Sequence, residues 1–124
     1  RGPAVRLAEG EGWSTPPQEQ QFLIAKALAH PLRRWLFEEL GGGRKIRLAE
    51  LTRRANGKGF KVTNAIVRYH LFLLERAGLV AVEGSGKWKW ARRVADVRLQ
   101  IRGFSGPPIP SDKELEREIK EVFG

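Results

Sequence analysis

The chain has 124 residues, enough for one domain with a buried core but too few for two. Its formal net charge of +9 indicates an anionic partner, with nucleic acid as the first candidate. It contains no cysteine, which excludes disulfides and thiolate metal sites, and no apolar run long enough to cross a bilayer or serve as a signal peptide, so we expect a cytoplasmic protein with no membrane partner.

The positive charge is concentrated in the middle of the chain. Residues 1–40 carry five basic and five acidic side chains, residues 41–110 carry fifteen and four, and residues 111–124 carry three and five. The corresponding net charges are zero, +11 and −2. An anionic partner is therefore expected to bind the middle segment.

The first helix is predicted within a domain that spans residues 15–102, after a flexible N-terminal arm formed by residues 1–14. Thr15 is a helix-capping residue, and the prolines that follow suit a first turn, so the helix should run from about Pro16 to Ala29. Its apolar residues cover more than one face. Either the helix lies deep in the core, or its second face, with Phe22 and Leu23, contacts another subunit.

A second helix is predicted from Pro31 to Leu40, because proline suits the first helical position and three glycines follow the end. Arg33 and Arg34 are expected on its solvated face, and Trp35 in the core. A short strand (45–48) and a short helix (49–55) should follow.

The longest helix is predicted to begin after the cap residue Thr63 and to end near Gly78. Helical spacing divides its side chains into two faces. The inward face is expected to hold Ile66, Val67, Leu71 and Leu74, and the outward face Asn64, Arg68, Tyr69 and Phe72.

A β-hairpin is predicted next, with strands over 79–83 and 87–93 and a tight turn at Gly84-Ser85-Gly86. Alternation places Lys87 and Lys89 on one face of the return strand, and Trp88 and Trp90 on the other. Residues 94–102 alternate again, which is compatible with an extension of the sheet.

The chain then continues through a Pro/Gly linker (103–110) to a C-terminal helix (111–124), which a capping box at Ser111 and Glu114 opens. This helix either docks on its own domain or pairs with another subunit. The expected dimer interface contains residues of both terminal helices: Phe22, Leu23, Leu115, Ile119, Val122 and Phe123.

Two stretches resemble the ArsR-type family of transcription regulators. The sequence A-L-A-H-P-L-R-R-W-L-F-E-E-L (27–40) resembles the second-helix signature of the family, and V-R-Y-H-L-F-L-L-E-R-A-G-L-V (67–80) is similar to its recognition helix and the start of its wing. The resemblance covers roughly residues 20–93. It implies a mainly α fold with a small β-hairpin wing (α+β), a winged helix-turn-helix. It also implies a homodimer that binds double-stranded DNA sequence-specifically as a transcription regulator.

The resemblance places the recognition helix, about residues 63–77, in the major groove, and the wing, about 80–93, on the backbone or minor groove. The residues expected to read bases are Asn64, Ala65, Arg68 and Tyr69. The residues expected to contact the DNA backbone are Lys58, Lys61, Thr63, Lys87, Lys89, Arg92 and Arg93. His70 matches a histidine of the family pattern, and either a packing role or a DNA contact fits its half-inward position.

Other functions find less support in the sequence. With no cysteine and only His30 and His70, we expect neither a metal sensor nor a bound cofactor. No nucleophile, base and orienting group stand together, so no enzyme is expected. The alternative is a winged helix that acts as a protein-docking subunit of a transcription or other nucleic-acid complex, which exposed tryptophans at 88 and 90 would suit.

Overall fold

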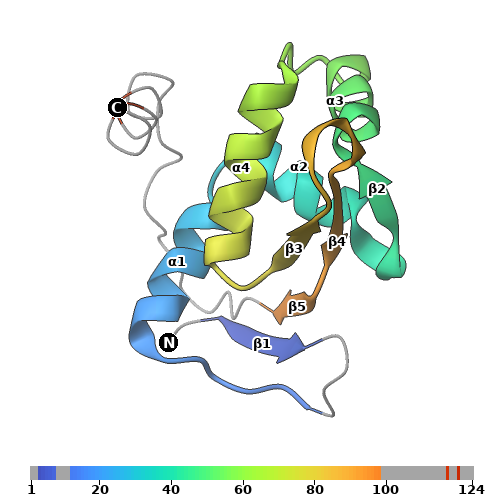
Figure 1. The fold of residues 1–124 in the computed structure, drawn as a ribbon. Helices are drawn as coiled ribbons and strands as arrows, with labels where there is room; N and C mark the ends of the chain where they lie inside the picture. Colours follow the sequence, from blue (N-terminus) through green and yellow to red (C-terminus); the bar gives the residue numbers. More distant parts are fainter. Residues whose placement is uncertain (1–2, 8–11, 99–116, 118–119, 121–124) are drawn as a thin grey trace.

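The computed structural model describes residues 3–7 and 12–98, together with Arg117 and Lys120, which are both helical. The predicted linker (103–110) and the rest of the predicted C-terminal helix lie outside the described residues. The elements, in chain order, are β1 (Ala4–Leu7), α1 (Gln18–Leu28), α2 (Pro31–Glu39), β2 (Lys45–Arg47), α3 (Leu48–Gly57), α4 (Asn64–Arg76), β3 (Val80–Glu83), β4 (Trp90–Arg93) and β5 (Ala95–Arg98), with short 3-10 turns η1 (Gly41–Gly43) and η2 (Gly86–Trp88) (Figure 1).

The core lies where the four helices meet. Ile24 of α1, Leu36 of α2, Leu51 of α3, and Val67 and Leu74 of α4 are fully buried. Each such side chain stabilises the fold by about 1.5 to 3 kcal/mol through removal from water. Helical periodicity placed Val67, Leu71 and Leu74 correctly. Trp35 also packs against the core as expected, with its ring centroid 5.8 Å from that of Phe60.

The corner between α1 and α2 is fixed by polar side chains. His30 caps α2, since its Nδ1 accepts a hydrogen bond from the backbone N–H of Leu32 at 3.1 Å. Arg33 was expected in solvent, but it is only 1% exposed. Its guanidinium donates to the backbone oxygens of Ala27 and Lys26, at 3.0 and 3.4 Å, and so satisfies carbonyls at the end of α1 that have no partner within the helix.

The start of α1 differs from the prediction. The capping residue is Pro17, which makes no side-chain capping bond, and Thr15 is not the cap. Instead, Gln21 reaches back from the first turn and donates to the backbone oxygen of Pro16 at 2.7 Å. The prolines therefore shift the first helical residue to Gln18.

A three-stranded antiparallel sheet, in the order β2-β4-β3, lies beside α3 and α4 (Figure 1). The register pairs Ile46 with Ala91 and Ala91 with Val82 in a row that faces the core. The return strand starts at Trp90, later than predicted, because residues 86–88 form η2. Gly84 permits this loop: its φ is +88°, and a Cβ there would lie 2.7 Å from the backbone oxygen of Trp88.

A second, two-stranded sheet pairs β1 with β5, from Ala4 opposite Arg98 to Leu7 opposite Ala95. Figure 1 shows this sheet at the end of the molecule where α4 terminates. Residues 95–98 therefore do not extend the wing sheet. Residues 4–7, within the expected flexible arm, form a strand whose Val5 is buried.

The order of four helices followed by a β-hairpin, with β2 completing the sheet, is a winged helix-turn-helix of the α+β class, as the sequence predicted. Among the described residues, no helix is both long and apolar enough to cross a membrane.

Candidate nucleic-acid interface

The start of α4 is capped and open to solvent. Thr63 accepts a hydrogen bond from the backbone N–H of Ile66 through its hydroxyl at 3.3 Å, as the sequence predicted. Thr63, Asn64 and Ala65 are all exposed. The remaining first-turn N–H groups and the positive end of the helix dipole favour a phosphate at this position.

The outward face of α4 carries Asn64, Ala65 and Arg68, as expected. Among the described residues, Arg68 has no hydrogen-bond or ion-pair partner, so its guanidinium is available to a ligand. Ile66 was expected in the core, but Ile66 and Phe72 are each 38% exposed. The open face of α4 is therefore wider and more apolar than helical spacing alone indicated.

Tyr69 is the exception among the predicted base-reading residues, because it is only 4% exposed. Its ring lies edge-on to that of His70, with the two centroids 5.3 Å apart. A tyrosine packed in this way does not present its side chain to a groove of DNA. Tyr69 is therefore a packing residue, contrary to the expectation from the sequence.

His70 is also buried, which decides between the two roles left open for it. Its ring stacks on that of His30, with centroids 4.7 Å apart and planes 23° from parallel. Burial, together with the nearby His30 and Arg33, lowers the pKa of His70 to about 3. His70 is neutral at pH 7 and links α4 to the corner between α1 and α2.

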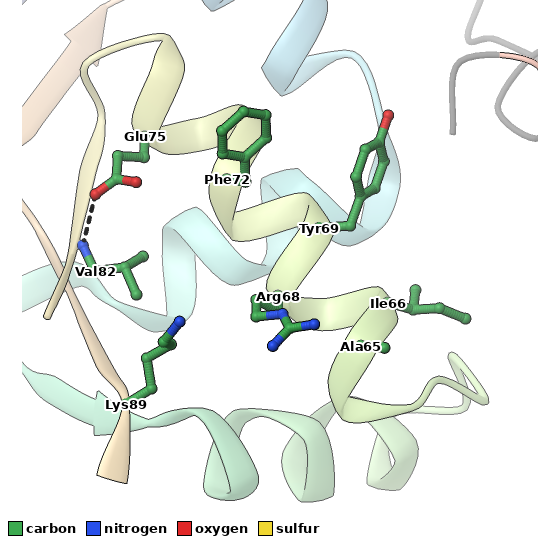
Figure 2. A pocket seen from close by; sticks show the side chains of 8 residues that line it. All are labelled: Ala65, Ile66, Arg68, Tyr69, Phe72, Glu75, Val82 and Lys89. Carbon is green, nitrogen blue, oxygen red and sulfur yellow. Dashed lines mark hydrogen bonds between the residues drawn. The ribbon is translucent and has the colours of Figure 1, made fainter. Parts of the chain in front are cut away.

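A groove of about 430 Å³ separates α4 from the wing. Ile66, Phe72 and Val82 contribute apolar surface, and Arg68 and Lys89 point into the groove from α4 and from the wing (Figure 2). Glu75 holds one end of the groove together, since its carboxylate accepts a hydrogen bond from the backbone N–H of Val82 at 3.1 Å. This hydrogen bond links the first strand of the wing to α4.

The turn between α3 and α4 carries Lys58 and Lys61. The amide of Asn56 accepts from the backbone N–H of Val62 at 3.0 Å and donates to the backbone oxygen of the same residue at 2.8 Å. Both lysines are exposed, and neither has a partner among the described residues. The turn, residues 58–63, is longer than usual for this motif, and the side chain of Asn56 closes it.

The wing residues predicted to contact DNA differ in their surroundings. Lys89 lines the groove without a partner in the described part of the chain, and Arg92 lies 3.5 Å from a carboxylate oxygen of Glu83. Arg93, in contrast, lies 3.7 Å above the ring of Phe37 and pairs with Asp96 at 2.9 Å. Arg93 is therefore committed to the fold, contrary to the prediction. The side chain of Lys87 lies outside what the structure describes.

Every carboxylate between residues 41 and 98 already has a hydrogen-bond or ion-pair partner. This segment holds fourteen Lys and Arg against four Asp and Glu. Glu50 accepts from Arg53 and Arg54, which lowers the pKa of its carboxyl to about 2. Glu75 and Glu83 have the partners given above, and Arg6, followed by Arg93, lowers the pKa of Asp96.

The surplus cations are thus left without carboxylate partners. In the described part of the chain they are Arg44, Lys45, Arg47, Lys58, Lys61, Arg68, Arg76, Lys89 and Arg98. No carboxylate of the described residues balances their charges, and polyanions are the partners that such a surface attracts.

On α1, Phe22 is 66% exposed, whereas Ile24 and Ala27 of the same helix are buried. The helix is therefore not enclosed on all sides, and its second apolar face is open. Phe22 and Leu23, together with Gln18 and Glu19, line a shallow hollow. The other four residues of the predicted dimer interface, at 115, 119, 122 and 123, lie outside the described residues.

No protein-family model matches the chain, and no curated protein matches it. Among solved structures, the crystal structure of an ArsR family transcriptional regulator is similar to it, with a TM-score of 0.49 and 22% sequence identity over 84% of this chain and 96% of that chain. This is a likeness of fold alone. Among the described residues, no group of three or more His, Asp or Glu side chains could hold a metal ion.

Proposed function

We propose that this protein is a transcription regulator that binds double-stranded DNA sequence-specifically, as a homodimer, with α4 in the major groove. The observation that carries the proposal is the exposed, capped start of α4, surrounded by cations that no carboxylate of the described chain neutralises. A helix of this kind fits the major groove, and unpaired Lys and Arg side chains replace the counterions of the phosphates.

Three exposed side chains of α4 supply the base contacts in this proposal. Arg68 donates its two-pronged guanidinium to guanine, and Asn64 pairs with adenine through its amide. Ala65 offers an apolar contact to a thymine methyl group, and the exposed Ile66 adds to this contact. These are contacts that distinguish one base pair from another.

The backbone contacts come from three places around α4. Lys58 and Lys61 approach phosphates from the turn, and Thr63 does so at the start of the helix. Lys89 and Arg92 approach from the wing, together with Lys87. These contacts fix the register of the protein on the duplex and make binding depend on salt, but they carry no sequence information.

The homodimer is proposed to form through the exposed Phe22 and the half-buried Leu23 of α1, and through the C-terminal residues Leu115, Ile119, Val122 and Phe123. The 66% exposure of Phe22 supports this arrangement, because an isolated aromatic side chain on an open helix face gains from burial against a second copy. Two copies related by a two-fold axis would read the two halves of a palindromic site.

Salt titration tests the proposal against the docking alternative. Affinity for duplex DNA should fall about 10³-fold or more between 50 and 200 mM salt if six or more phosphates are neutralised. A protein-docking module, which the 57% exposure of Trp88 would suit, should bind duplex DNA weakly at both salt concentrations. Weak binding throughout would overturn the DNA-binding proposal.

A further inference from the structure

The three-stranded sheet has a second face, which points away from the core. Strand alternation places Arg47, Trp90 and Glu83 in one row across this face, and Lys45, Arg92 and Ala81 in the next. The residues that line the groove with α4 do not belong to these rows. The outer face of the sheet is therefore a surface separate from the reading face of α4.

Cations and indole rings alternate on this outer face. The Nζ of Lys45 lies 4.7 Å from the ring centroid of Trp90, and the guanidinium carbon of Arg47 lies 4.7 Å from that of Trp88. Trp88 follows the wing turn and is 57% exposed. Such stacking holds the indole rings in place, so they are oriented before any ligand binds.

The charge of this face is also unbalanced. Among the six described residues of these two rows, Glu83 is the only acidic one, and it pairs with Arg92 at 3.5 Å. Lys45 and Arg47 have no carboxylate partner among the described residues. The face thus combines free positive charge with exposed aromatic surface.

We propose that this outer face binds single-stranded nucleic acid. Lys45 and Arg47 contact phosphates, and unpaired bases stack on Trp88 and, less extensively, on the half-buried Trp90. Positively charged surfaces that carry stacking aromatic side chains bind single strands with little sequence preference. The inference does not rest on the proposed reading of duplex DNA by α4.

The chemistry favours a single strand over the other polyanions. Bases in a duplex are stacked on each other and do not offer their planes to an indole, whereas bases in a single strand do. A polyanion without bases, such as heparin, binds the Lys and Arg side chains but cannot stack on the indole rings. Comparison of these ligands therefore separates stacking from simple attraction between charges.

Binding of a labelled single-stranded oligothymidine of about 12 nucleotides, measured by fluorescence anisotropy, tests the proposal. Trp88→Ala should weaken binding about 5- to 10-fold, whereas Trp88→Phe, which keeps an aromatic ring, should bind nearly as well as the wild type. Trp13→Ala is the matched control, since Trp13 also lies beside cations, Arg6 and Arg98, but on the other sheet. It should leave oligothymidine affinity unchanged.

Three further comparisons locate the site. Heparin affinity should not change in Trp88→Ala, and oligothymidine affinity should not change in Arg68→Ala. Lys45→Gln should weaken oligothymidine binding more than Arg34→Gln, an exposed arginine on α2.

The proposal is overturned if Trp88→Ala binds oligothymidine like the wild type, or if it loses heparin affinity by the same factor. It is also overturned if Arg68→Ala weakens oligothymidine binding as much as Trp88→Ala does, because the single strand would then bind at α4. Failure to find a specific duplex site would refute the proposed function and leave this result unaffected.

Discussion

Acidification should destabilise the protein through His70. This side chain is 2% exposed, stacks on His30, and has a pKa lowered to about 3 by burial and by the neighbouring charges of His30 and Arg33. In the unfolded chain the same imidazole has an ordinary pKa of about 6.5. Between these two values the unfolded protein binds a proton on His70 and the folded protein does not, so the free energy of unfolding falls as the pH falls.

The magnitude follows from the two pKa values. A pH of about 5 is about 1.5 units below the pKa of the unfolded chain, and each unit corresponds to about 1.4 kcal/mol. The free energy of unfolding should therefore fall by about 2 kcal/mol between about pH 8 and about pH 5. The loss should grow as the pH falls further toward the folded pKa of about 3. Well above the pKa of the unfolded chain, His70 causes no loss of stability.

Urea unfolding at the two pH values measures this loss, with His70→Leu as the comparison. The variant has no imidazole at this position, so its free energy of unfolding should change much less between about pH 8 and about pH 5 than that of the wild type. The carboxylates contribute little in this window because they titrate mainly below it. If the variant loses as much stability as the wild type, His70 is not the group responsible.

Four other substitutions test the roles of individual side chains. Arg68→Ala should weaken binding to the preferred duplex by about 1 to 3 kcal/mol and relax the preference at one base position, whereas Lys89→Ala should weaken binding to all duplexes alike. If both variants behave identically in a competition assay, the assignment of Arg68 to base contacts and of Lys89 to backbone contacts is wrong. Asn56→Ala should lower the free energy of unfolding by about 1 to 2 kcal/mol, because the turn between α3 and α4 loses its side-chain hydrogen bonds. An unchanged urea midpoint would show that these hydrogen bonds do not stabilise the turn. Arg93→Gln should lower the free energy of unfolding by a similar amount, about 1 to 2 kcal/mol. It should leave the salt dependence of DNA binding unchanged, whereas a shallower salt dependence would mean that Arg93 contacts the DNA backbone.

The sequence predicted those parts of the fold that depend on local pattern. The cap at Thr63, the inward positions of Val67 and Leu74, and the exposure of Arg68 all follow from neighbours within one helix turn. Helical spacing alone was less reliable at the edges of the inward face. It placed Ile66 inside and Tyr69 outside, whereas the packing of α4 against its neighbours reverses both.

The parts that the sequence missed depend on contacts between distant residues. Arg33 is buried because its guanidinium fits the end of α1, and the half-buried Arg93 is held by Phe37 and Asp96. Strand β1 exists because residues 95–98 offer it a partner some 90 positions away. No periodicity in residues 1–14 predicts that pairing. A stacked pair of cation and indole on adjacent strands is equally invisible before the register is known.

Selection of binding sites from random duplexes, carried out in parallel with the wild type and with Arg68→Ala, tests the central proposal most directly. The wild type should enrich a palindromic consensus, as expected for a homodimer that places one α4 in each half-site. Arg68→Ala should enrich the same consensus with one position per half-site relaxed, a position where the wild type selects guanine. If the wild type enriches no sequence, or if the variant enriches an identical consensus, α4 does not read DNA in the way proposed.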